Sequence, residues 1–75
     1  MQEMLEYIVK NLVSNPDAVE ISFENQGKTK VFKVKVDGKD LGNVIGRGGS
    51  IANAIRTVVR STSTKERLVI KFEEK

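Results

Sequence analysis

The 75-residue sequence contains no cysteine and no histidine. Without cysteine the chain forms no disulfide and offers no thiolate nucleophile, and without both residues the common zinc-ligand sets are excluded. A chain that lacks cysteine is typical of a reducing compartment, so we expect a cytoplasmic protein. The apolar runs are only a few residues long, and we therefore expect no membrane-spanning segment.

Aromatic residues are also scarce, at 5% of the chain. Phe23, Phe32 and Phe72 alternate with polar residues in segments that resemble strands, so we expect all three to point inward. Stacking of bases on aromatic rings should then contribute little to any binding of nucleic acid. No serine lies in a nucleophile motif, and the acidic residues are scattered over predicted strand faces and termini. We therefore predict no enzymatic activity, cofactor, metal or small-molecule substrate.

The charge is distributed unevenly along the chain. Thirteen basic and ten acidic residues give a net charge of +3. Residues 1–26 hold one basic and five acidic residues, a net −4, whereas residues 27–75 hold twelve basic and five acidic residues, a net +7. Such a basic region fits a polyanionic partner, although a solvated surface of uneven charge explains the same pattern.

Apolar periodicity predicts six elements in one domain that covers residues 1–75. They are a helix over 4–13, strands over 19–24, 32–36 and 68–72, and helices over 41–45 and 51–60. Asn15-Pro16 should end the first helix, because proline disfavours the helical conformation of the residue before it. Asp40 is the expected N-cap of the second helix. The order α-β-β-α-α-β predicts an α+β fold in two layers, with three helices covering one face of a three-stranded sheet.

A glycine cluster lies between the last two predicted helices, in the segment VIGRGGSIANAI at residues 44–55. It matches neither the G-x-G-x-x-G dinucleotide fingerprint nor the G-x-x-x-x-G-K-[ST] phosphate loop. The remaining interpretation is a helix, a G-x-x-G turn at residues 46–49, and a second helix. Such a turn lets a nucleic-acid backbone approach, and the unpaired N–H groups and dipole of the following helix favour phosphate. Arg47, at the tip of the turn, is the expected side-chain anchor.

The sequence around this turn resembles the signature of K-homology (KH) domains, V-I-G-x-x-G-x-x-I-x-x-I-R. The matching residues are Val44, Ile45, Gly46, Gly49, Ile55 and Arg56. The resemblance covers essentially the whole chain, and its element order is similar to the type II arrangement of the bacterial KhpA (YlqC) family. It implies that the G-x-x-G loop clamps about four nucleotides of single-stranded RNA or DNA, of which we expect RNA. It also implies a homodimer, a partner of the KhpB/Jag type, and a role in RNA regulation linked to cell elongation and division.

The predicted nucleic-acid site includes the loop and the residues beside it. The main candidates are Ile45, Gly46, Arg47, Gly48, Gly49, Ser50 and Arg56, and the weaker ones are Gly42, Asn53, Lys65 and Arg67. Several interpretations remain open at this stage. Ser50 either caps the last helix or contacts phosphate, and Gly42 either allows close helix packing or leaves space for a ligand. Arg56 and Arg60 either contact phosphate or lie on a solvated helix face.

Two functions follow from these observations. The first is non-catalytic binding of single-stranded RNA, with an affinity that comes mostly from phosphate contacts and falls with salt. The alternative is a protein-interaction or dimerisation module with weak or lost RNA binding, in which Ala54 and Val58 belong to the dimer seam. Neither function requires a membrane.

Overall fold

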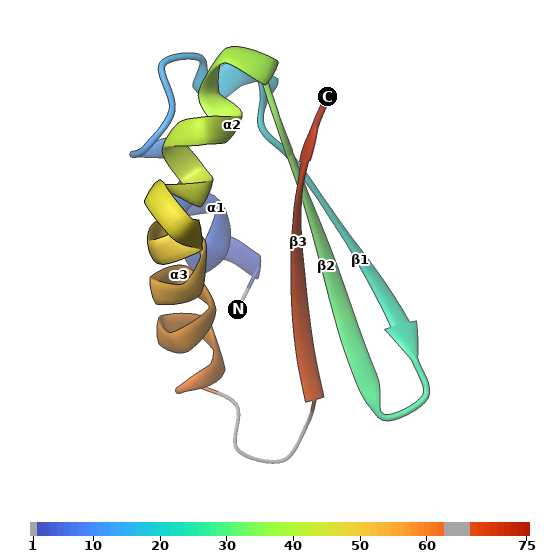
Figure 1. Cartoon of the computed structure of the whole chain (residues 1–75). Helices are drawn as coiled ribbons and strands as arrows, with labels where there is room; N and C mark the ends of the chain where they lie inside the picture. The colour runs from blue at the N-terminus through green and yellow to red at the C-terminus, as the bar shows by residue number, and fades with distance from the viewer. Residues whose placement is uncertain (1, 63–66) are drawn as a thin grey trace.

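A computed structural model describes residues 2–62 and 67–75 and contains the predicted order of helices and strands (Figure 1). The elements are α1 (Gln2–Lys10), the 3-10 turn η1 (Pro16–Ala18), β1 (Glu20–Gln26), β2 (Thr29–Val36), α2 (Gly38–Ile45), the 3-10 turn η2 (Arg47–Gly49), α3 (Ser50–Arg60) and β3 (Arg67–Glu74). All three α-helices lie on one face of the sheet (Figure 1). The prediction of a two-layer α+β fold is therefore confirmed.

The sheet has the strand order β1-β2-β3, with β2 in the centre. Strands β1 and β2 form an antiparallel hairpin whose turn contains Gly27 at a φ of 65°. Strand β3 pairs with β2 in the parallel direction, because α2 and α3 carry the chain back across the sheet between them. The outer edge of β3 lies beside α3 (Figure 1). Both helices that flank the glycine turn, α2 and α3, contact β3.

The core lies between the sheet and the helices, as the alternation in β2 predicts. Phe32, Val34 and Val36 are buried, and the alternate residues of the strand face the helix-free side. The helices contribute Leu5, Val9, Val44, Ile55 and Val59 to this core, and β3 contributes Leu68 and Ile70. Phe23 pairs in register with Phe32, at 5.1 Å between ring centroids, but 45% of its surface is exposed. The inward direction of Phe23 was predicted correctly, but its burial was not, since it belongs to an edge strand.

Helix α1 ends earlier than its apolar spacing predicts. It stops at Lys10, and the side-chain amide of Asn11 donates to the carbonyl of Tyr7 at 2.7 Å. The backbone N–H of Asn11 is shared between the carbonyls of Tyr7 and Ile8, at 3.3 and 3.2 Å, and the N–H of Leu12 donates to the carbonyl of Val9 at 2.9 Å, so the last turn tightens to i→i−3 bonds. Leu12 lies beyond the helix and is 37% exposed. The helix therefore ends five residues before Asn15, and Pro16 is not the cause.

The prediction that Asp40 caps α2 is wrong. The helix begins at Gly38 and its N-cap is Asp37, whose Oδ1 accepts from the N–H of Lys39 at 3.1 Å. Asp40 lies within the helix and is only 1% exposed. Its carboxylate accepts from the backbone N–H and hydroxyl of Ser14, at 2.9 and 2.8 Å, and from the N–H of Asn15 at 3.1 Å. Asp40 thus ties the segment after α1 to the helix that leads into the glycine turn.

Candidate nucleic-acid interface

The glycine turn connects α2 to α3 through three glycines that have positive φ angles. Gly46 ends α2, donating its N–H to the carbonyl of Gly42 at 2.9 Å, with φ 76° and ψ 172°. Gly48 and Gly49 follow at φ values of 63° and 79°. Residues other than glycine rarely adopt such backbone angles. The turn is therefore built by its glycines, and α3 begins directly after it.

These glycines differ in the space around them. A Cβ atom on Gly46 would lie 2.7 Å from Cγ1 and 2.9 Å from the backbone nitrogen of Ile51. On Gly48 a Cβ atom would meet nothing within 4 Å, and the same is true of Gly42. Gly46 is thus needed for packing, whereas Gly48 and Gly42 face open space. The open space at Gly42 argues against the interpretation that it allows close helix packing, and a ligand role for Gly42 stays a prediction.

Arg47 and Ser50 flank Gly48 and Gly49 in the turn. Arg47 is exposed, and its guanidinium has no partner among the residues that the structure describes. The N-cap of α3 is Gly49, so Ser50 is the first residue of the helix and its hydroxyl makes no capping bond. The early N–H groups of a helix lack intrahelical acceptors and carry partial positive charge. The turn therefore combines exposed backbone, a free arginine and a helix N-terminus, which together suit an anion.

Arg56 and Arg60 do not extend from a simple solvated helix face. The Nε of Arg56 donates to the carbonyl of Ile70 at 3.2 Å, and the Nε of Arg60 donates to the carbonyl of Leu68 at the same distance. The guanidinium of Arg56 also lies 5.4 Å from the ring centroid of Phe72. Both arginines therefore bridge α3 to β3, and we call this line of contacts the α3–β3 seam. Sequence reasoning missed this role, because it depends on β3 being an edge strand.

Asn53 connects the seam to the turn. Its Oδ1 accepts from Nη1 of Arg56 at 3.0 Å. Its Nδ2 lies 3.8 Å from the position that a Cβ atom would take on Gly49. The structure therefore brings the turn, Asn53 and Arg56 together.

The other predicted site residues lie less close to the turn. Ile45 is half-buried and packs against the core, and its contact with nucleic acid stays a prediction. Arg67 is exposed and begins β3, next to the Leu68 carbonyl that Arg60 binds and farther along the seam from the turn. Lys65 lies outside the described residues.

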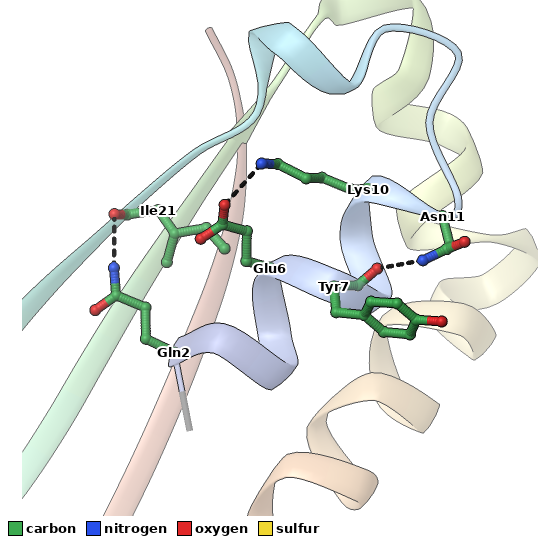
Figure 2. A network of polar contacts seen from close by, with 6 residues as sticks. All are labelled: Gln2, Glu6, Tyr7, Lys10, Asn11 and Ile21. Carbon is green, nitrogen blue, oxygen red and sulfur yellow. Dashed lines mark hydrogen bonds and ion pairs between the residues drawn. The ribbon is translucent and has the colours of Figure 1, made fainter.

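A shallow surface hollow of about 240 Å³ lies elsewhere, on α1. It is lined by Glu3, Glu6, Tyr7 and Lys10, and Lys10 is paired with Glu6 at 2.7 Å. Figure 2 shows these polar contacts along α1, together with the bond from Gln2 to the carbonyl of Ile21. Because its carboxylates outnumber its cations, this hollow does not suit the phosphate ligand expected at the turn.

The described residues contain no group of three or more acidic, histidine or cysteine side chains placed to hold a metal ion. In the same part of the chain, no helix combines the length and apolarity that crossing a bilayer requires.

The element order, the parallel β2–β3 pair and the G-x-x-G turn between α2 and α3 define a type II KH fold. Comparison with known families agrees, since residues 2–73 match the family described as KhpA/KhpB, KH domain. The chain belongs to this family. Membership also confirms the prediction that the protein is not an enzyme.

Curated relatives extend over most of the chain. The RNA-binding protein KhpA of Streptomyces coelicolor is 48% identical over 59 residues, which cover 79% of this chain and 75% of that protein. KhpA of Caldanaerobacter subterraneus is 43% identical over 67 residues, 89% of each chain. KhpA of Listeria monocytogenes is 40% identical over 73 residues, 97% of this chain and 96% of that one. No solved structure gave a significant match.

Proposed function

We propose that this protein binds single-stranded RNA, with the phosphate backbone held by the turn from Gly46 to Gly49. The observation that carries the proposal is the exposed backbone of Gly48 next to the exposed side chain of Arg47, directly before α3. The name of the relatives, RNA-binding protein, supports RNA as the polyanion. Domains of this kind clamp about four nucleotides with the G-x-x-G loop.

Phosphate contacts should supply most of the affinity. Phe32 is buried and Phe72 lies under Arg56, so neither ring offers a free stacking face at the turn. Each phosphate contact to a single strand contributes a slope of about −0.7 in the logarithm of affinity against the logarithm of salt concentration. The affinity of the protein for a short RNA should therefore fall as salt rises.

Fluorescence anisotropy with a short single-stranded RNA of mixed sequence tests this proposal. The variant Arg47→Asp, Gly48→Asp places two carboxylates at the turn, where nothing crowds position 48 and aspartate tolerates a positive φ. We expect measurable binding by the wild type that weakens with salt, and no binding by the variant. Circular dichroism checks that the variant is folded.

A matched control makes the same change in net charge at a distant surface. Lys71→Glu with Ser22→Glu also lowers the net charge by three, on exposed positions of the helix-free face of the sheet. This control should keep most of the affinity if the turn is the site. Equal losses in the two variants would show that only net charge matters, and equal binding by the turn variant and the wild type would contradict the proposal.

We also propose that the protein forms a homodimer through the exposed faces of α1 and α3. Tyr7 is 69% exposed on α1 and Val58 is 49% exposed on α3, with the exposed Ala54 one helical turn before Val58. Singly exposed apolar side chains are ordinary on protein surfaces, but α1 and α3 pack against each other, and exposed apolar residues gathered on neighbouring helices mark interaction surfaces. Val58→Lys should give a monomer by light scattering with unchanged circular dichroism, and a persistent dimer would reject this face.

We propose a second protein partner as well, a larger protein of the KhpB/Jag type, which the resemblance to the KhpA family implies. We propose that the two act together in the cytoplasm in RNA regulation linked to cell elongation and division. Co-purification of the two proteins, with Val58→Lys and the turn variant compared, would identify which surface the partner uses. Absence of the complex at concentrations at which the homodimer forms would contradict this pairing.

A further inference from the structure

Asn53 is an exposed residue in the first turn of α3, and its side-chain amide has a fixed orientation. The Oδ1 atom accepts from Nη1 of Arg56 at 3.0 Å. A guanidinium group carries only donors, so the atom that faces it must be the amide oxygen, and the NH2 group points elsewhere. The Nδ2 atom lies 3.8 Å from the position that a Cβ atom would take on Gly49. The amide therefore directs its donors toward the glycine turn.

Arg56 holds this amide from a position that is itself fixed. Its Nε donates to the carbonyl of Ile70 at 3.2 Å, and its guanidinium lies 5.4 Å from the ring centroid of Phe72. An exposed asparagine without such a partner would lose side-chain freedom on binding a ligand, and this loss would weaken the binding. The bond from Arg56 restricts that freedom before any ligand binds, so the donors of Asn53 are preorganised.

The space next to the amide nitrogen is open because residue 49 is a glycine. Apart from the adjoining backbone, Nδ2 of Asn53 is the only atom of the described residues within 4 Å of the Cβ position on Gly49. An RNA backbone bound at residues 46–49 would therefore pass within reach of this amide. Phosphate oxygens are the strongest acceptors in that backbone, because their charge shortens and strengthens a hydrogen bond.

On the basis of the proposed RNA binding, we propose that Nδ2 of Asn53 donates to a phosphate oxygen at the glycine turn and that Arg56 is the positioning residue for this contact. The 2′-hydroxyl of RNA is the other backbone acceptor that suits the same amide. Arg56 acts through Asn53, since its guanidinium meets the amide and β3 rather than the phosphate. A neutral amide releases no counterion, so this contact adds affinity without adding to the salt slope.

Fluorescence anisotropy with the short mixed-sequence RNA measures the affinity and salt slope of the wild type, Asn53→Ala, Arg56→Lys and the double variant, each checked by circular dichroism. Arg56→Lys keeps the charge but lacks the planar group that bonds to Asn53 and Ile70 at once. Asn53→Ala should weaken binding about threefold to tenfold, the size expected for one hydrogen bond, with an unchanged salt slope. Arg56→Lys should give a similar loss, and the double variant should lose no more than either single variant.

Arg60→Lys is the matched control for Arg56→Lys. It makes the same substitution on the same seam, where Nε of Arg60 donates to the carbonyl of Leu68, and no bond joins Arg60 to Asn53 among the described residues. This control should leave the affinity nearly unchanged. Equal losses in Arg56→Lys and Arg60→Lys would assign the effect to the β3 edge and overturn the positioning role, as would additive losses in the double variant.

Two further results concern Asn53 itself. An unchanged affinity in Asn53→Ala would overturn the amide contact. An RNA of the same sequence with 2′-fluoro groups separates the two backbone acceptors: the loss in Asn53→Ala should persist with this RNA, and a loss confined to the hydroxyl-bearing RNA would assign the amide to the sugar and overturn the phosphate contact. Each of these contrary results with a wild type that binds RNA overturns only this inference, whereas no binding by the wild type would overturn RNA binding itself.

Discussion

Replacing Gly46 with alanine tests the structural role of the turn most directly. At φ 76° and ψ 172°, Gly46 lies in a region that is essentially restricted to glycine, where strain costs about 1–3 kcal/mol. The added Cβ would also lie 2.9 Å from the backbone nitrogen of Ile51, which cannot move independently of α3. Overpacking of this kind costs about 1–3 kcal/mol more. We therefore expect Gly46→Ala to lower the free energy of unfolding by about 3 kcal/mol or more.

Gly48→Ala is the matched control, because it adds the same methyl group two residues away. Gly48 has a φ of 63°, but its Cβ would meet nothing within 4 Å, so only the left-handed strain of about 1–2 kcal/mol applies. For a domain of this size, whose stability is about 4–11 kcal/mol, the two variants should differ clearly. Urea unfolding followed by circular dichroism measures both. With a slope of about 1 kcal/mol per molar urea, their midpoints should differ by about 1–2 M. Equal midpoints would refute the argument that packing against Ile51 fixes Gly46.

Three further predictions concern the rest of the fold. The hydrogen bond from the Ser14 N–H is the main cause that lowers the pKa of Asp40 from its ordinary value of 3.8. The stabilisation by Asp40 is therefore complete above that value and is lost as the pH falls through the lower pKa of the folded state. Asp40→Asn should lower the urea midpoint at neutral pH and make the midpoint depend less on pH in acid. An unchanged dependence on acid pH would contradict this prediction. Phe23→Ala should lower the free energy of unfolding by about 1 kcal/mol, because its ring is half-exposed. Phe32→Ala should lower it by about 3–5 kcal/mol in the same assay, because Phe32 is buried. Similar losses in the two variants would contradict the difference in burial. Gly38→Ala should change stability by less than about 0.5 kcal/mol, because the added Cβ meets only the flexible carboxylate end of Glu74, and a large loss of stability would show that this end cannot move.

The parts of the fold that the sequence predicted correctly depend on local patterns. The alternation in β2 predicted its buried face because adjacent strand residues point to opposite sides of a sheet. The glycine turn was also predictable, since left-handed φ values at Gly46, Gly48 and Gly49 require the residue type that the sequence places there. In both cases the physical constraint acts within a few residues, so the sequence contains it directly.

The parts that were missed depend on contacts between distant segments. Asp40 fits the pattern of an N-cap, but its carboxylate binds Ser14 and Asn15, which are about 25 residues earlier in the chain. Arg56 and Arg60 fit a solvated face, but the edge of β3 supplies two carbonyls for them. No spacing rule identifies these partners, because the choice between solvent and a distant acceptor is made only when the elements pack together.

The turn and the seam therefore provide different evidence for binding. Gly46 is required by the fold, so its presence says nothing about a ligand. Within residues 2–62 and 67–75, by contrast, no packing contact requires the open space at Gly48 or the exposed side chain of Arg47. Arg56 and Arg60 stabilise the β3 edge as well, so a loss of affinity on mutating them does not by itself identify a ligand contact. Only a change in base preference or in salt slope distinguishes the two roles. A loss of binding at Arg47 and Gly48, measured in a folded protein, needs no such correction, and for this reason the turn is the stronger test of function.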